Sequence, residues 1–358
     1  MTDSTAIIPF QGKPTVVVQD IMKQIVADRS KARYNGENAI FMMWLFDQDS
    51  LNEDLLYDWA LERMRVAYDV DTELGNNDAA GSKEPKRTTL RAECRKLLEA
   101  VNKDDHNSPV ILEKVTFNVF SHYMTTRETK DGKMLSKSSY GGIRSAFVYL
   151  HRMNGSQMTP DMQKNLSQLM SGIKRQVTKK KVASGESLDE GKRHMSFDAY
   201  CLMCEKLVES DASEALFAHA FLTMEWNLMA RSDNCKNMHV SHVEWRQDAL
   251  VFFFGKTKGD QTGENSDEAW HVYSNPQNPM ICPVLALSKY VFAHPDIVKE
   301  NGELFSGSDQ YSRFIKIFHR VIDQNEEEFM RIGVKKNMLG SHSCRKGAIT
   351  LVSTGCTV

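Results

Sequence analysis

Ser341-His342-Ser343-Cys344-Arg345-Lys346 is the stretch around which the rest of the chain is organised. His342 and Arg345 are three residues apart, so on a helix they share one face. Ser341 is a favourable N-cap for that helix, whose apolar side is predicted from Ala348, Ile349 and Leu351. A helix start presents unpaired backbone N–H groups and a partial positive charge. Together with an imidazole and a guanidinium, these groups predict a phosphate-binding site.

A His and an Arg at this spacing are also common on solvated helix faces. Other residues of the chain must therefore indicate whether this is a phosphate-binding site. Arg231 stands at the end of an apolar helical stretch, and Lys256 and Lys258 follow a predicted strand. Two guanidiniums can bind the oxygens of a phosphodiester and stabilise its transition state. A lysine on a hairpin can protonate a departing oxygen, and a histidine can donate a hydrogen bond. We therefore expect Arg231, His342, Arg345 and one of the two lysines to converge on one pocket.

The composition is that of a globular protein, with 358 residues, 41% hydrophobic and 26% charged. No apolar run is long enough to span a membrane, and residues 1–10 lack the pattern of a signal peptide. The seven cysteines are scattered, which favours free thiols in an intracellular protein. The net charge of −2 means that binding of a polyanion depends on local basic patches. No cluster of acidic residues suggests a metal site, and we expect no cofactor.

Helical periodicity dominates the first half of the chain. Helices are predicted over 16–31, over 50–67 with a capping box of Ser50 and Glu53, and over 89–101. Further helices are predicted to begin at Pro109, at Ser138 or Ser139, and at Thr159-Pro160, while the run 39–46 is ambiguous. The last helix leads into a basic run that is either solvated surface or a DNA-binding patch at a domain junction, formed by Lys174, Arg175, Lys179, Lys180 and Lys181.

The second half combines helices with a small antiparallel sheet. A helix is predicted from Ser196, and an almost wholly apolar one from 214 to 229. Strands are predicted over 240–245, 249–254 and 269–273. Helices follow from Pro283 and over 308–323, where Tyr311 is predicted to lie on the core face. The fold class is therefore mainly α with a small antiparallel β-sheet.

The order of these parts resembles that of the tyrosine recombinases, or phage-integrase-type recombinases. The matching segments are Asn227-Leu228-Met229-Ala230-Arg231-Ser232-Asp233, Phe253-Phe254-Gly255-Lys256-Thr257-Lys258 and Ser341-His342-Ser343-Cys344-Arg345. The segment Ile281-Cys282-Pro283-Val284-Leu285-Ala286-Leu287 is similar to diverged recombinases of eukaryotic, crypton-like mobile elements. The resemblance covers roughly 110–358.

Helical and polar stretches divide the chain into parts, and the resemblance implies the roles of the helical domain and of the last part. Residues 1–88 would be an N-terminal helical region with a polar loop, and 89–180 an all-α core-binding domain that contacts DNA. Residues 181–195 would be a flexible linker. Residues 196–358 would be an α+β catalytic domain of the tyrosine-recombinase type, truncated at its C-terminal end.

The resemblance also implies function. Arg231 and Arg345 would clamp the scissile phosphate, His342 would assist, and Lys256 or Lys258 would be the general acid in DNA recombination or integration. The expected partner is double-stranded DNA, with room for a homo-oligomer on DNA, no membrane and no small-molecule cofactor; in a eukaryote the protein would act in the nucleus. The family's nucleophilic tyrosine would follow the H-x-x-R helix, yet no tyrosine follows Arg345. We therefore expect residues 1–358 to bind duplex DNA without forming a phosphotyrosine link.

Two other functions are compatible with the sequence. A domesticated DNA-binding module that never cleaves is the main alternative, and an unrelated α-rich interaction protein is the third. A hydrolase using Cys344 beside His342 is disfavoured, because no residue is evident that would orient the histidine.

Overall fold

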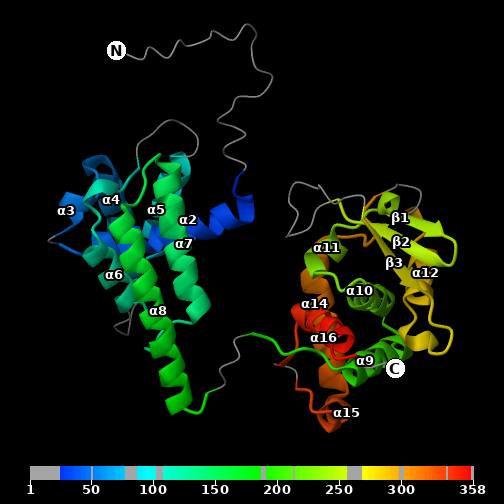
Figure 1. Ribbon diagram of the computed structural model, residues 1–358. Coiled ribbons are helices and arrows are strands. Elements are labelled where there is room, and N and C mark those ends of the chain that lie inside the picture. Colours follow the sequence, from blue (N-terminus) through cyan, green and yellow to red (C-terminus); the bar gives the residue numbers. More distant parts are fainter. Residues whose placement is uncertain are drawn as a thin grey trace, which may run out of the picture. The chain divides into compact units, whose positions relative to one another are not determined.

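The computed structural model describes residues 25–49, 51–76, 87–101, 108–186, 191–212, 214–255, 268–297, 302–335 and 338–355. The chain forms two compact units, residues 1–190 and 191–358. Most of the described residues are helical, and the strands form one small sheet (Figure 1). The predicted fold class, mainly α with a small antiparallel sheet, is therefore confirmed.

The regular structure among the described residues of the first unit is helical, with two isolated β-bridges. Residues 39–67 and 90–177 share one hydrophobic core, so the N-terminal segment packs together with the later helices. Stacked and edge-on rings of Phe41, Phe120 and Phe147 lie at its centre. The helices are α2 (Asp28–Phe46), α3 (Asn52–Leu55), α4 (Asp58–Asn76), α5 (Thr88–Ala100), α6 (Phe117–Thr126), α7 (Lys137–Met153) and α8 (Pro160–Ala183), with a 3₁₀ turn at Leu112–Lys114.

Local signals set several helix ends correctly. The Thr159 hydroxyl accepts the N–H of Met162, and Pro160 opens α8. Asn154 ends α7, and Gly155 follows with φ of 63°, which a glycine adopts without strain. The cap of α7 is Ser136, not Ser138 or Ser139, because its hydroxyl accepts the N–H of Ser139.

The single helix predicted over 50–67 is wrong, because α3 ends at Leu55 and α4 begins at Asp58. Leu56 forms an antiparallel bridge with Val110, and the N–H of Tyr57 donates to the carbonyl of Pro109. These long-range bonds use the backbone groups that a continuous helix would need. For the same reason Pro109 does not open a helix, and α6 begins only after the Thr116 cap. The helix predicted over 16–31 is described only from residue 25; α2 runs from 28 to 46 and includes the ambiguous run 39–46.

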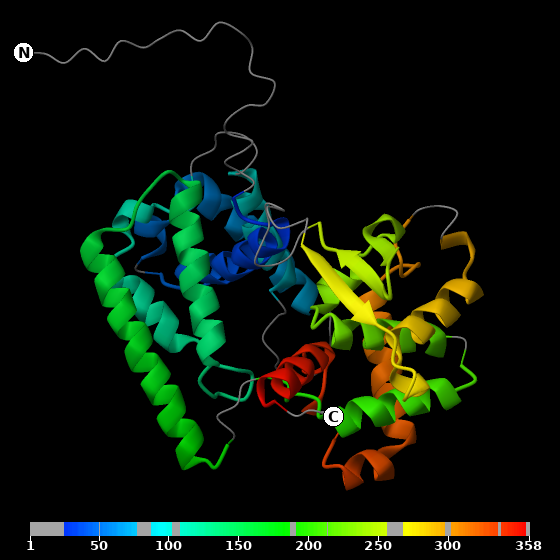
Figure 2. The same cartoon turned by 45° about the vertical axis from the view of Figure 1, so that its right-hand side comes forward.

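The second unit surrounds α10 (Ala215–Asn227), whose residues from Phe217 to Trp226 are all buried. Around it lie α9 (Phe197–Glu209), α11 (Ser232–Lys236), α12 (Pro283–Ala293), α14 (Gln310–Gln324), α15 (Glu326–Arg331) and α16 (Ser341–Ser353), with 3₁₀ turns at Val240–His242 and Pro279–Ile281. Figures 1 and 2 show the helices grouped around α10, with the sheet at one side of this unit. Because α10 is apolar on all sides, it can only be stable when fully enclosed.

The sheet has the order β1-β2-β3, with both neighbouring pairs antiparallel. Its strands are β1 (Val243–Arg246), β2 (Ala249–Phe253) and β3 (Ala269–Tyr273). Gln247, with φ of 53°, lies in the tight turn between the first two strands. Residues 256–267, which connect β2 to β3, lie outside the described residues.

Candidate functional site

The helix that carries the H-x-x-R motif begins one residue earlier than its predicted cap. Gly340 is the N-cap, and its N–H donates to the Ser343 hydroxyl at 3.0 Å. Ser341 is the first helical residue, so its predicted capping role is wrong. The Ser341 hydroxyl, which is almost wholly buried, instead donates to the phenolic oxygen of Tyr311 at 3.3 Å. The start of α16 is therefore tied to α14 by a pair of hydroxyl groups.

Arg231 and Arg345 lie close enough to interact. Arg231 is the last residue before α11 and is half-buried; Arg345 is half-buried on the second turn of α16. Burial lowers the pKa of Arg345, and the positive charge of Arg231 lowers it further. Arginine side chains carry a positive charge, so the two guanidiniums repel each other and an anion between them would be stabilising. Two such cations near a helix start are suited to a shared phosphate.

Of the other residues predicted for the phosphate site, the structure describes His342 but neither lysine. His342 is the second residue of α16 and is exposed, next to Ser341. Lys256 and Lys258 lie outside the described residues. The structure thus brings together Arg231 and Arg345 and sets His342 on the first turn of the same helix as Arg345.

Tyr311 differs from its prediction. Its side chain is 43% exposed, so the expectation that it lies in the core is wrong. The core face of α14 turns Phe314 and Phe318 inward, whereas Tyr311 lies on the first turn of the helix and its hydroxyl meets that of Ser341. Ser341 and Arg345 are four residues apart on α16, so they share a face. The Tyr311 hydroxyl therefore belongs to the surroundings of the arginine pair.

A buried carboxylic acid is hydrogen-bonded to the residue that follows Arg231. Glu225, on α10, is fully buried, and one of its oxygens accepts the hydroxyl proton of Ser232, the residue after Arg231. Its other oxygen has no hydrogen-bond partner among the described residues. Burial raises the pKa of Glu225 from its ordinary value of 4.5 to about 8, against the smaller lowering effect of the Ser232 bond. Sequence reasoning missed this residue, although a lone Glu within an otherwise apolar helix was a visible signal.

Replacing Glu225 by Gln is expected to change how stability depends on pH. The folded state holds this proton up to about pH 8, whereas the unfolded chain releases it near 4.5. The free energy of unfolding of the parent should therefore fall as pH rises through that window, by about 1.4 kcal/mol per pH unit at most. The free energy of unfolding of the Gln variant should lack this slope, so the variant should become more stable relative to the parent as pH rises. Urea unfolding of both proteins at pH 5 to 8 measures the difference. Parallel pH profiles of the two proteins would show that Glu225 ionises freely in the folded state.

Cys344 cannot act as a nucleophile in the folded protein. Its thiol is buried and donates to the carbonyl of Leu222, and burial holds its pKa well above the usual range. This disfavours a hydrolase built on Cys344 and His342. Among the described residues no cluster of three His, Cys, Asp or Glu side chains could hold a metal ion. The described cysteines are free thiols.

The basic run predicted to bind DNA lies entirely on α8. Lys174, Arg175, Lys179 and Lys180 are exposed, and Lys181 is half-buried on the last turn of the helix. The C-terminal end of α8 extends past the neighbouring helices of the first unit (Figures 1 and 2). The run is therefore a helical surface, and α8 continues to Ala183, past residue 181 where the linker was predicted to begin.

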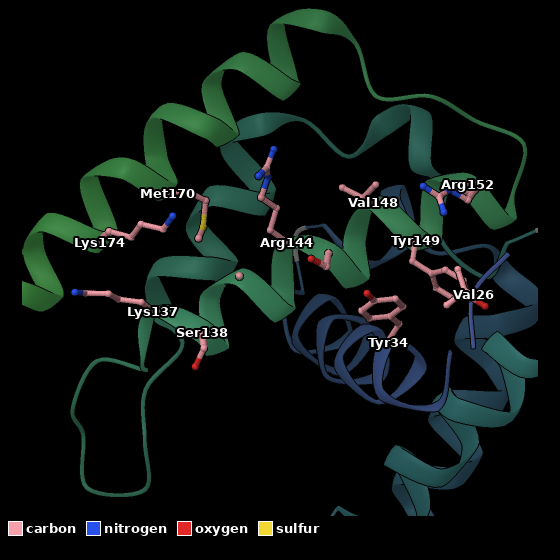
Figure 3. A pocket seen from close by; sticks show the side chains of 12 residues that line it. Val26, Tyr34, Lys137, Ser138, Arg144, Val148, Tyr149, Arg152, Met170 and Lys174 are labelled. Carbon is pink, nitrogen blue, oxygen red and sulfur yellow. The ribbon is translucent and has the colours of Figure 1, made fainter. Parts of the chain in front are cut away.

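The first unit also contains a pocket of about 740 Å³ that sequence reasoning missed (Figure 3). Tyr34 of α2, the exposed face of α7 and Lys174 of α8 form its walls. Its cationic side chains are Lys137, Arg144, Arg152 and Lys174, of which only Lys174 belonged to the predicted basic run. The signal in the sequence was weak, because three of these cations come singly along α7 and not as a run.

No known family model matches the chain, and no curated protein matches it. Among solved structures it is similar to the XerH site-specific recombinase bound to a difH substrate before cleavage, with 12% identity, a TM-score of 0.43, and coverage of 93% of this chain and 89% of that one. It is also similar to XerH bound to a palindromic difH substrate after cleavage, with 12% identity, a TM-score of 0.45 and coverage of 90% and 86%. The XerA recombinase has 14% identity, a TM-score of 0.31 and coverage of 84% and 86%.

Proposed function

We propose that the chain binds double-stranded DNA and holds one backbone phosphate between Arg231 and Arg345 at the start of α16. The observation that carries this proposal is that Arg231 lies near enough to Arg345 for its positive charge to lower the pKa of Arg345, at the start of α16. A phosphodiester satisfies both by bidentate hydrogen bonds and removes their repulsion. The exposed His342 and the Tyr311 hydroxyl add donors beside the same helix start.

The finer proposal is that this phosphate is the site of DNA strand breakage and rejoining. Arg231 and Arg345 would stabilise the charge on the non-bridging oxygens, and His342 would donate a hydrogen bond. Lys256 or Lys258 would protonate the departing 5′ oxygen. On this proposal the helical first unit contains the core-binding domain, the second unit is catalytic, and the protein acts on DNA inside the cell, in the nucleus of a eukaryote, as a homo-oligomer. Within the described residues, no helix has the length and apolarity needed to cross a membrane.

Duplex binding and its electrostatics are tested together. Changing Lys179, Lys180 and Lys181 to Ala should weaken binding to all sequences. It should also flatten the dependence of affinity on salt by roughly one unit of slope per lost phosphate contact. Fluorescence anisotropy with labelled duplexes at several salt concentrations measures both quantities.

A matched control removes three exposed lysines elsewhere in the same unit, namely Lys114, Lys130 and Lys164. It makes the same change in net charge and should leave the slope close to that of the parent. If affinity depends on salt with the same slope in the two triple variants, the α8 lysines do not contact DNA and are ordinary solvated surface. Absence of duplex binding by the parent itself would refute the proposed function.

Tyr311 is expected to bind the phosphate and not to attack it. Its hydroxyl accepts a hydrogen bond from Ser341, which leaves its own proton available for a phosphate oxygen. Replacement of Tyr311 by Phe should therefore lower duplex affinity about 10-fold, the lower end of the value for a hydrogen bond to a charged group. A nicked suicide duplex should give no covalent complex on a denaturing gel. A covalent band that disappears in the Phe variant would make Tyr311 the nucleophile; binding without any band supports a DNA-binding module that does not cleave.

A further inference from the structure

The residues on both sides of Arg231 are bonded to the same residue of α10. The N–H of Ala230 donates to the backbone carbonyl oxygen of Glu225 at 3.1 Å. The hydroxyl of Ser232 donates to the carboxyl group of Glu225. Ala230, Ser232 and Glu225 are all buried, and Arg231 is half-buried. Glu225 therefore holds the chain immediately before and immediately after the arginine.

The backbone that leads to Arg231 has an uncommon conformation. Met229 has φ of 44°, in the left-handed region that residues other than glycine adopt rarely and at a cost. Its N–H donates to the carbonyl oxygen of Trp226 at 3.1 Å, as is common where a helix ends. After this turn, the carbonyl oxygen of Arg231 accepts the first N–H groups of α11. The position of Arg231 thus depends on bonds that hold a strained turn in one shape.

The carboxyl group of Glu225 lies near both helices that carry the arginine pair. Burial raises the pKa of Cys235 on α11 and of Cys344 on α16 well above the usual range, and the nearby Glu225 carboxylate raises both further. Both helices contact α10 (Figure 1). Cys204 of α9, which lies next to Cys344, is held neutral by burial in the same way. Glu225, with its pKa raised by burial to about 8, is therefore the member of this cluster that changes charge between pH 7 and pH 9.

A buried glutamate in this place is costly unless it has a task. One carboxyl oxygen of Glu225 has no hydrogen-bond partner among the described residues, and an unpaired buried polar atom lowers stability. An apolar side chain of similar size would fill the core of α10 without that cost. What such a side chain could not do is accept the hydroxyl proton of Ser232 next to Arg231.

We propose that Glu225 is a positioning residue for Arg231: as a neutral acid bonded to Ser232 it fixes the turn that presents the guanidinium to a DNA phosphate, and as a carboxylate it repels that phosphate. The inference rests on the proposed function, to which it adds a residue that touches no DNA and a dependence of binding on pH. Glu225 acts through the placement of Arg231 and through its own charge.

The positioning role is tested with Ser232→Ala, which removes the bond and leaves Glu225 in place. Competition anisotropy of the full chain on a labelled duplex should show affinity lower by about 2- to 10-fold, the value of one hydrogen bond. In the Arg231→Ala background the same change should have no further effect, because it acts only through that arginine. In the triple α8 lysine variant it should keep its full effect.

The matched control is Ile322→Val, in the core of the same unit. Ile322 is buried on α14, and the loss of one methylene group lowers stability without changing the turn at Arg231. Urea unfolding measures the stability of both variants. The Ile322→Val variant should bind duplex DNA like the parent, whereas Ser232→Ala should not.

The role of the charge is tested with Glu225→Gln, which keeps an oxygen that can accept the Ser232 hydroxyl proton but cannot ionise. Below about pH 8 the folded parent holds Glu225 neutral, and above it the carboxylate forms. Duplex affinity of the parent should therefore fall about 3- to 10-fold from pH 7 to pH 9, through repulsion between the carboxylate and the phosphate. The affinity of the Gln variant should stay within about twofold over the same range. Arginines do not lose their charge there, so a difference between the two profiles belongs to Glu225.

Two results would overturn the inference and leave the proposed function standing. One is parent-like binding by Ser232→Ala when Arg231→Ala binds more weakly, and the other is the same pH profile for the parent and the Gln variant. Absence of duplex binding by the parent, or undiminished binding by Arg231→Ala, would instead refute the proposed function.

A measurement without DNA decides the inference in that second case. The NMR signal of the Arg231 guanidinium carbon is assigned by its loss in Arg231→Lys. It should move in the Ser232→Ala variant, and between pH 7 and pH 9 it should move in the parent but not in Glu225→Gln. An Arg231 signal that responds to neither change would show that Glu225 does not position this residue.

Discussion

Replacing either Arg231 or Arg345 by alanine is expected to weaken the binding of duplex DNA by about 10- to 100-fold, the value of hydrogen bonds to a charged group. Each guanidinium would contribute two parallel bonds to the same phosphate, which a lysine cannot reproduce. Arg231→Lys and Arg345→Lys should therefore recover only part of the loss. Competition anisotropy against a fixed labelled duplex measures all four variants at one salt concentration.

The double variant tests whether the two residues share one phosphate. Arg231 and Arg345 carry like charges close together, so removing one of them also removes the repulsion that acts on the other. Losses in affinity should then be clearly non-additive, as for residues with a common partner. Arg331→Ala is the control, because Arg331 is exposed on α15 and faces Glu327 at 3.9 Å. Additive losses, or losses no larger than that of Arg331→Ala, would contradict a shared phosphate.

Replacing Gly347 by alanine is expected to destabilise the second unit by about 3 kcal/mol. Within a helix this exchange ordinarily stabilises by about 0.5–1 kcal/mol. Here a Cβ would lie 2.1 Å from the Met195 carbonyl oxygen and 2.9 Å from a ring carbon of Trp226. The first of these atoms belongs to the backbone, so no change of side-chain rotamer relieves the contact.

The neighbours of Gly347 are themselves held in place. The N–H of Met195 donates to the Ser343 carbonyl at 2.9 Å, and Trp226 stacks on Tyr200 with ring centroids 4.2 Å apart. The helix must therefore move as a whole, which would also displace Arg345 and weaken DNA binding. Urea unfolding gives the change in stability, with Gly302→Ala as the control because its surroundings are open. Equal stability of the two variants would mean that α16 shifts without strain.

Much of the fold was determined by local sequence signals. The helix predicted over 89–101 agrees with α5, and the caps at Thr159 and Ser196 are both found. These signals are reliable because they involve side chains and backbone groups only three or four residues apart. The three strands were also found within a few residues, because alternation and a tight turn are local features.

The errors lie where distant segments compete for the same backbone groups. The break between α3 and α4 results from bonds to residues 109–111, more than fifty positions away. The same bonds delay α6 until the Thr116 cap. Likewise, residues 39–67 share their core with 90–177, a packing relation that no local pattern reveals.

For the candidate site, the sequence by itself determined the types of residue and their positions on a helix start. It supplied Arg231, His342 and Arg345 as candidates, because the spacing of His342 and Arg345 fixes their shared face. Only the tertiary structure brought Arg231 near Arg345, placed the Tyr311 hydroxyl at Ser341 and buried Glu225 behind Ser232. The physical reason is that charge repulsion, exposure and burial depend on side chains from separate helices, whose packing is decided by the whole core of the unit.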